Sequence, residues 1–192
     1  MTEEEIATEN AAIAKEYKKL LKISYRTLTA TDKKLIRKAF EVALDAHSDQ
    51  RRKSGEAYIF HPIAVAKIVA SEIGLDANSI AAALLHDVVE DCPRYTIDDI
   101  QQLFGETVAR IVNGLTKISN IKKDMNVSMQ AENFRRMLLT LHDDIRVIII
   151  KIADRLHNMQ TIHSMREDKQ LKIASETLYI YAPLAHKIGL YN

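Results

Sequence analysis

The chain has 192 residues, which suits one domain or one domain with an appendage. Apolar residues make up 47% and charged residues 28%, which excludes a disordered, collagen-like or mucin-like protein. Lys and Arg total 27 against 26 Asp and Glu, so no whole-molecule field would attract nucleic acid or an anionic membrane. No apolar run approaches the roughly 20 residues of a membrane span. The acidic start does not resemble a signal peptide, and Cys92 has no second cysteine to pair with, so we expect a cytoplasmic protein.

The chain is predicted to be built from helices, because five Gly and three Pro leave little to interrupt them. The start signals are local: Pro62 suits a first helical turn with His61 at its entrance, Asp76 or Ser79 opens a helix, and Thr96 begins a capping box. Periodicity predicts helices over 3–22, 31–47, from 62, from 76 or 79 with 80–85 fully buried, from 97 to 104, 105–118 and 128–142, with loops at 48–60 and 119–127.

Residues 145–152 are ambiguous. Their β-branched side chains are typical of a buried strand, which stays the minority interpretation. The apolar pattern continues without a breaker for over 20 residues, which favours a central helix. Since no second convincing strand exists to pair with it, we predict an all-α fold.

The densest polar cluster is His86-Asp87-Val88-Val89-Glu90-Asp91, directly after a buried run. On a helix, His86 and Glu90, and Asp87 and Asp91, would stand one turn apart. Such groups need a compensating partner where they are partly buried, and a divalent cation would be one. The alternative is a helix end that turns into solvent with ordinary surface acids.

A second cluster, Asp154, Asn158 and Thr161, has the spacing of one helix face. The alternative for this cluster is a structural salt bridge of Asp154 to Arg155 or Arg146. For His61 taken alone, the more common role would be that of a structural hydrogen-bonding group. Taken together, His61, His86, Asp87 and Asp154 form a nitrogen–oxygen donor set that suits Mn²⁺, Fe²⁺, Co²⁺ or Zn²⁺. Glu90 and Asp91 would then orient a metal-bound water or accept its proton.

The loop Gln50-Arg51-Arg52-Lys53-Ser54-Gly55-Glu56 is a candidate phosphate site shortly before His61. Arginine and lysine suit phosphate oxygens, and glycine permits a close backbone approach. Most such runs are solvated surface loops, which is the alternative. No P-loop, GxGxxG, GxSxG or CxxC motif is present.

Five segments resemble the hydrolase domain of the long Rel/Spo homologue enzymes, which make and degrade the guanosine alarmones ppGpp and pppGpp. They are RRKSGEAYIFHPIAVAKIVA, AAALLHDVVED, FGETVARIVNGLTKI, QAENFRRMLL and DIRVIIIKIADRLHNMQT. The resemblance runs in order from about residue 20 to the end. It implies an all-helical fold of the HD superfamily, a metal-dependent phosphohydrolase bundle that binds Mn²⁺ and removes the 3′-pyrophosphate to leave GDP or GTP.

The resemblance also assigns roles by position. It implies that His61, His86, Asp87 and Asp154 bind the metal, and that Glu90 and Asp91 activate water. A further set is implied to contact the substrate: Arg52, Lys53 and Ser54 on the loop, and Asn158 and Thr161 toward the nucleoside.

The same resemblance predicts a domain organisation: an N-terminal helical extension over 1–30, the hydrolase domain over 31–178, and over 179–192 the start of a passage to a synthetase domain. We therefore expect this chain to be the N-terminal part of a longer enzyme, with synthetase and regulatory domains as partners and no activity in synthesis. Two alternatives stay open. One is another HD-type phosphohydrolase, such as a small alarmone hydrolase, and the other is a regulatory or interaction module that is inactive in isolation.

Overall fold

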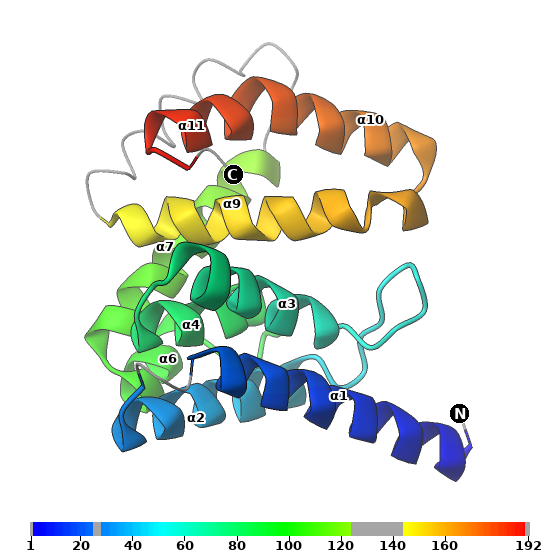
Figure 1. Cartoon of the computed structure of the whole chain (residues 1–192), viewed down its shortest axis with the longest axis vertical. Coiled ribbons are helices and arrows are strands. Elements are labelled where there is room, and N and C mark those ends of the chain that lie inside the picture. Colours follow the sequence, from blue (N-terminus) through cyan, green and yellow to red (C-terminus); the bar gives the residue numbers. More distant parts are fainter. Residues whose placement is uncertain (1, 25–27, 124–143, 191–192) are drawn as a thin grey trace. The chain divides into compact units, whose positions relative to one another are not determined.

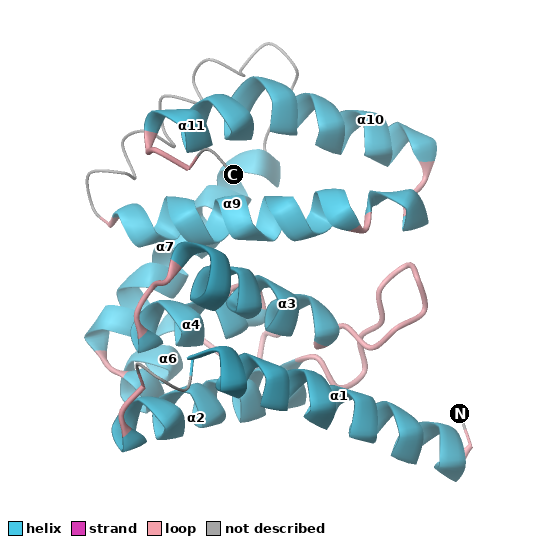
Figure 2. Ribbon diagram, in the orientation of Figure 1, coloured by secondary structure: helices cyan, strands magenta, loops and turns pink. Residues whose placement is uncertain are grey.

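The computed structural model describes residues 2–24, 28–123 and 144–190. Every regular element within these ranges is helical, and extended backbone pairs there only at an isolated bridge between Arg51 and Ala57 (Figure 2). The predicted all-α fold is therefore confirmed. The chain divides into two compact units, Met1–Val112 and Asn113–Asn192.

The elements follow one another along the chain as labelled in Figure 1. The first unit holds α1 (Glu3–Ser24), α2 (Ala30–Ala46), α3 (Phe60–Ile68), the π-helical turn η1 (Val69–Ile73), α4 (Ala77–Leu84), α5 (Val88–Asp91), α6 (Ile97–Phe104) and the start of α7 (Glu106–Lys123). The second unit holds the rest of α7, α9 (Ile145–Gln160), the 3₁₀ turn η3 (Ile162–Ser164), α10 (Glu167–Glu176), the π-helical turn η4 (Thr177–Tyr181) and α11 (Ala182–Lys187).

Side-chain caps fix the starts of several helices. The Asp76 carboxylate accepts a hydrogen bond from the backbone N–H of Ser79 at 2.9 Å, which settles the choice between these two residues as the start of α4. Thr96 and Asp99 form the predicted capping box at α6. Each cap supplies a partner for a backbone N–H that the first helical turn leaves unpaired.

Two predicted boundaries are wrong. The helix α4 ends at Leu84, and His86 and Asp87 lie in the turn before α5 rather than on one continuous helix. The helix α7 continues to Lys123, through the first part of the loop predicted at 119–127. The rest of that loop and the helix predicted over 128–142 lie outside the described residues.

The core of the first unit is organised by α4, which packs against α2 and α3, while α1 packs against α3. The run from Ile80 to Leu85 is fully buried, as predicted. A bond from Lys38 Nζ on α2 to the carbonyl oxygen of Leu103, at 2.9 Å, ties the end of α6 to this core. These contacts hold the ends of α3 and α4 beside each other, and the candidate histidines lie at those ends.

The second unit is organised by α9, whose β-branched residues Val147, Ile148 and Ile150 are buried. The helical interpretation of residues 145–152 is therefore confirmed. The turn η4 packs against α9, and the guanidinium of Arg155 lies 4.5 Å from the ring centroid of Tyr181. Ile180, Tyr181 and Leu184, near the C-terminal end of the described residues, are buried and contribute to the core of this unit.

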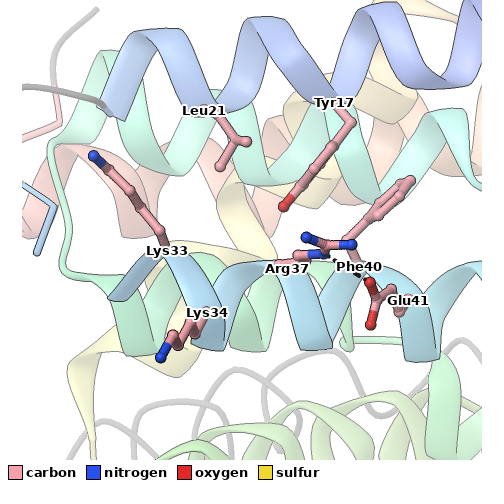
Figure 3. Close-up of a pocket in the computed structure, with 7 residues that line it drawn as sticks. All are labelled: Tyr17, Leu21, Lys33, Lys34, Arg37, Phe40 and Glu41. Atoms are coloured by element: carbon pink, nitrogen blue, oxygen red, sulfur yellow. Dashed lines mark hydrogen bonds and ion pairs between the residues drawn. The ribbon is translucent and has the colours of Figure 1, made fainter. Parts of the chain in front are cut away.

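A surface hollow of about 430 Å³ lies between α1 and α2 (Figure 3). Its lining includes the stacked rings of Tyr17 and Phe40 and the ion pair between Arg37 and Glu41, and none of the predicted site residues line it. Among the described residues, no helix has both the length and the apolar character needed to cross a membrane.

Candidate metal centre

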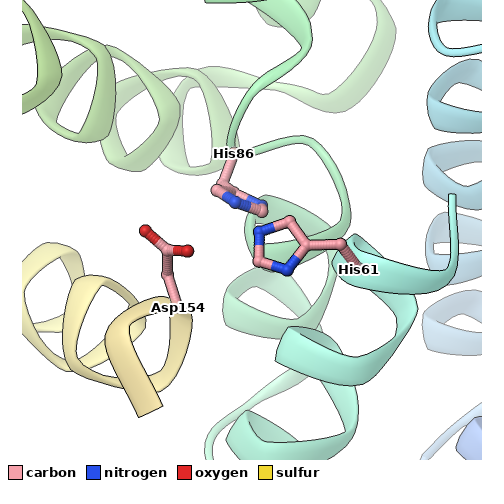
Figure 4. A group of neighbouring side chains, drawn as sticks. All are labelled: His61, His86 and Asp154. Carbon is pink, nitrogen blue, oxygen red and sulfur yellow. The ribbon is translucent and has the colours of Figure 1, made fainter. Parts of the chain in front are cut away.

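Two buried histidines and a carboxylate converge in the first unit. His61 lies in the first turn of α3, and His86 and Asp87 lie in the turn after α4. The two imidazole rings are 2% and 1% exposed as residues, and their centroids lie 5.1 Å apart in an edge-to-face arrangement (Figure 4). The Oδ2 atom of Asp87 lies 2.9 Å from His86 Nε2 and 3.9 Å from His61 Nε2.

The geometry of His86 fixes which nitrogen carries the proton. Its Nδ1 lies 2.8 Å from the carbonyl oxygen of Ala83, and because a carbonyl oxygen only accepts, Nδ1 must donate. In the neutral ring, Nε2 then presents a lone pair toward Asp87 Oδ2, which is also an acceptor. Two acceptors at 2.9 Å need a cation or a proton between them.

The distances between these nitrogen and oxygen atoms fit a shared divalent cation. Ligand atoms at about 2.1 Å from a metal ion and at right angles to each other are about 3.0 Å apart, and opposed ligands are about 4.2 Å apart. The separations of 2.9 and 3.9 Å from Asp87 Oδ2 both fall within these limits. The carbonyl that holds His86 Nδ1 is also the type of outer partner that metal-binding histidines commonly have.

The second unit presents the other predicted ligand, Asp154, on α9. Its Oδ1 accepts a hydrogen bond from Asn158 Nδ2 at 2.7 Å, and its Oδ2 lies 3.5 Å from the ammonium of the buried Lys151. The alternative partners have other contacts: Arg146 pairs with Asp144 and Arg155 with Glu176. Asp154 and Asn158 lie on α9 as predicted, but Thr161 does not, because the helix ends at Gln160. Thr161 caps the helix and donates its hydroxyl to the carbonyl oxygen of His157.

The two predicted water-activating acids lie on the short helix α5. Glu90 is half-buried and Asp91 is exposed. The backbone N–H of Asp91 donates to the carbonyl oxygen of Asp87 at 2.9 Å. Glu90 and Asp91 therefore directly follow the turn that carries His86 and Asp87, called the ligand turn below. The predicted pairing along one helix is replaced by a turn followed by a short helix.

The predicted phosphate loop is a tight turn. Arg52 N–H donates to the carbonyl oxygen of Glu56, and Gly55 takes φ +90°, a conformation that side-chain-bearing residues rarely adopt. Arg52 is half-buried, while Lys53 and Ser54 are exposed.

Arg51, at the base of the loop, has a different role. Its guanidinium forms a two-pronged ion pair with Glu9 on α1, with N–O distances of 2.8 and 2.9 Å. The hydrogen bond from Arg51 lowers the pKa of Glu9 below its usual value. Of the three cations that the sequence placed on this loop, one therefore anchors the loop to α1.

Sequence analysis missed three residues beside the histidines. The Tyr58 hydroxyl donates to Asp87 Oδ2 at 2.6 Å, and its ring centroid lies 4.6 Å from that of the buried His47. The ring nitrogen Nδ1 of His47 bonds to Gln50 Oε1 at 2.9 Å, and burial lowers the pKa of His47 against the opposing effect of that bond. The bond between His47 and Gln50 is local, but the contacts of Tyr58 with Asp87 and with His47 join residues far apart in the chain, so only the fold shows that this group lies beside the ligands.

Comparison with known proteins agrees with this architecture. A family model described as the HD domain matches residues 39–191. The bifunctional (p)ppGpp synthase/hydrolase SpoT of Escherichia coli is 53% identical over 159 residues, which are 83% of this chain and 22% of the relative. The guanosine-3′,5′-bis(diphosphate) 3′-pyrophosphohydrolase of Aquifex aeolicus is 48% identical over 157 residues, which are 82% and 22% of the two chains.

The chain therefore spans about a fifth of the length of these relatives. A solved structure of a metazoan SpoT orthologue, which hydrolyses ppGpp and plays a role in starvation responses, has a TM-score of 0.59 and 24% identity. The match covers 85% of this chain and 98% of that one, and at this identity it shows a shared fold. Because the family model spans most of the sequence, the chain belongs to the HD domain family.

Proposed function

We propose that the chain is a metal-dependent 3′-pyrophosphohydrolase that converts ppGpp and pppGpp to GDP and GTP with release of pyrophosphate. The observation that carries the proposal is the convergence of His61, His86 and Asp87, in which the Nε2 lone pair of His86 faces Asp87 Oδ2 and a cation would satisfy both atoms. The names of the relatives from Escherichia coli and Aquifex aeolicus supply the substrate and the reaction.

We propose that Mn²⁺ is held by His61, His86, Asp87 and Asp154. When bound, such an ion lowers the pKa of a water molecule and polarises a phosphoryl oxygen. Within the second unit, Asn158 holds Asp154 Oδ1 in one orientation, which supports a ligand role for this carboxylate, since ligands are commonly oriented by outer hydrogen bonds.

We assign the remaining site residues to water activation, phosphate binding and nucleoside contact. Glu90 and Asp91 orient the attacking water and take up its proton. Arg52 and Lys53 bind the phosphate oxygens, and the loop is already held in a tight turn for them. Two further groups, Ser54 on the loop and Asn158 with Thr161 at the end of α9, contact the nucleoside.

The relatives also suggest the setting of this reaction. We propose residues 1–30 as an extension, 31–178 as the hydrolase domain and 179–192 as a passage toward synthetase and regulatory domains, and the name of the bifunctional synthase/hydrolase of Escherichia coli supports the synthetase domain. In that arrangement the hydrolase would act in the cytoplasm, where it would lower alarmone levels in the stringent response.

The decisive experiment measures pyrophosphate release from ppGpp and pppGpp with and without added Mn²⁺, and follows the conversion of dNTPs, cyclic nucleotides and NADPH by chromatography of their nucleotide products. We expect release from ppGpp and pppGpp alone. Turnover of the other nucleotides would favour a broader HD-type phosphohydrolase, and absence of any turnover by folded, metal-loaded protein would favour a regulatory module.

The ligand set is tested by measuring the metal content of Asp154→Ala. We expect this variant to lose the metal and the activity together while keeping its helical content. The matched control is Asp168→Ala, which removes an exposed carboxylate paired with Arg166 on the surface. Full metal occupancy in Asp154→Ala would remove Asp154 from the ligands.

A further inference from the structure

Asp87 is held by a tyrosine that no sequence motif singles out. The hydroxyl of Tyr58 donates to Asp87 Oδ2 at 2.6 Å, a distance typical of a hydrogen bond from a hydroxyl to a charged carboxylate. The same Oδ2 atom is the one that faces both histidines. A carboxylate oxygen can accept from a hydroxyl while it also faces a cation, because it has more than one lone pair.

The ring of Tyr58 is itself fixed between aromatic neighbours. Its centroid lies 4.6 Å from the ring of His47, at the end of α2, and 5.7 Å from the ring of His61, which it meets edge-on. Its backbone N–H donates to the carbonyl oxygen of Gln50 at 3.0 Å. Ring and backbone are thus both constrained, so the hydroxyl reaches Asp87 from a defined direction.

We infer that Tyr58 is a positioning residue for the metal centre: its hydroxyl fixes the Asp87 carboxylate with Oδ2 toward His86 and His61. This inference rests on the proposed function, in which Asp87 is a metal ligand. Without the hydroxyl, the carboxylate would rotate more freely about its side-chain torsions, and ordering it again would reduce the free energy of metal binding. Loss of one such outer hydrogen bond typically lowers metal affinity about 10- to 100-fold.

The backbone around Tyr58 gives this residue a second connection. The bond to Gln50 and the adjacent bridge between Arg51 and Ala57 close the segment that carries the candidate phosphate residues. Tyr58 therefore lies at the junction between the phosphate loop and the ligand turn. Because phenylalanine would keep the backbone and the ring, removing the hydroxyl alone tests the link to Asp87 and leaves the loop closed.

The test is Tyr58→Phe, with Mn²⁺ affinity measured by calorimetric titration. We expect the Kd for Mn²⁺ to rise about 10- to 100-fold, and kcat for ppGpp to return toward the wild-type value at saturating Mn²⁺. The matched control is Tyr95→Phe, which removes a hydroxyl that donates to Asp45 Oδ2 at 2.9 Å and leaves the ligands untouched. This control should bind Mn²⁺ as the wild type does.

A double-mutant cycle separates the role of the hydroxyl from a general loss of structure. If Tyr58 acts through Asp87, then the loss of unfolding free energy caused by Tyr58→Phe in metal-free protein should be far smaller in an Asp87→Ala background, which lacks the accepting oxygen, than in the wild type. An unchanged Kd in Tyr58→Phe would overturn the inference, as would equal effects in both backgrounds. Failure of the wild-type protein to bind Mn²⁺ would instead overturn the proposed function.

Discussion

The close approach of two helices at Gly114 gives a stability prediction with a definite cause. Gly114 lies on α7, and a Cβ atom there would stand 2.7 Å from Val147 Cγ2 and 3.2 Å from Val147 Cγ1 on α9. Carbon atoms prefer separations of about 3.5–4.0 Å, so Gly114→Ala creates an overlap. Rotating the valine relieves little, because a helical valine strongly prefers one χ1 rotamer.

The size of the effect follows from two opposing terms. Overpacking in a well-packed core costs about 1–3 kcal/mol. Replacing a glycine inside a helix by alanine contributes about 1 kcal/mol in the other direction. The net loss of unfolding free energy for Gly114→Ala is therefore about 0–2 kcal/mol, and each kcal/mol corresponds to about 2–4 °C in Tm for a chain of this size.

Urea unfolding of the single and double variants measures this overlap. In Val147→Ala, a residue that is 1% exposed loses its two methyl groups and leaves a cavity, which costs stability. Combining it with Gly114→Ala removes the overlap and lets the new methyl group fill part of that cavity. We expect the double variant to be more stable than additivity predicts, by about 0.5–3 kcal/mol. Additive effects, or a Gly114→Ala variant stabilised by the full helix propensity, would refute the close approach.

Sequence reasoning succeeded where a structure is determined by residues close together in the chain. The start of α4 depends on a bond between Asp76 and Ser79, and the start of α6 on the box between Thr96 and Asp99. Both signals span one helical turn, so they can be read directly from the sequence. The run at 145–152 was correctly identified as helical because its length outweighed its β-branched composition.

The boundaries that sequence reasoning missed have no local signal. Neither glycine nor proline marks the end of α4 at Leu84, and the turn there is held by the bond of His86 Nδ1 to the carbonyl oxygen of Ala83. The predicted end of α7 at residue 118 falls too early, because the polar residues that follow also suit a loop. Polar residues continue a helix readily when one face remains buried, as Leu115 and Ile118 show.

The candidate site also combines residues that the sequence indicates with contacts that only the fold reveals. Its residue types and motifs indicated His61, His86 and Asp87, and the fold brings these three together. The hydroxyl of Tyr58 reaches Asp87 across 29 positions in the sequence, and Glu9 reaches Arg51 across 42. Such contacts depend on tertiary packing, so no spacing rule in a single sequence reveals them.

The remaining predictions concern the first unit. Glu9→Gln should raise KM for ppGpp with little change in kcat, because the ion pair with Arg51 anchors the phosphate loop to α1. Since salt screens this ion pair, the difference in KM from the wild type should shrink as the salt concentration rises. Equal KM values at low salt would show that the loop needs no such anchor. His47→Asn should flatten the pH dependence of stability in metal-free protein. Burial holds the pKa of His47 below its usual 6.5, so in the interval below 6.5 the unfolded chain binds more protons than the folded one. The contribution of His47 to stability is therefore complete above pH 6.5 and is lost as the pH falls below 6.5 through the folded-state pKa. Asparagine keeps a side-chain donor for Gln50 but does not titrate, so wild-type unfolding free energy should fall more steeply than that of the variant between about pH 7 and pH 5. Parallel curves over that interval would mean that His47 takes up its proton in the folded protein as easily as in the unfolded chain.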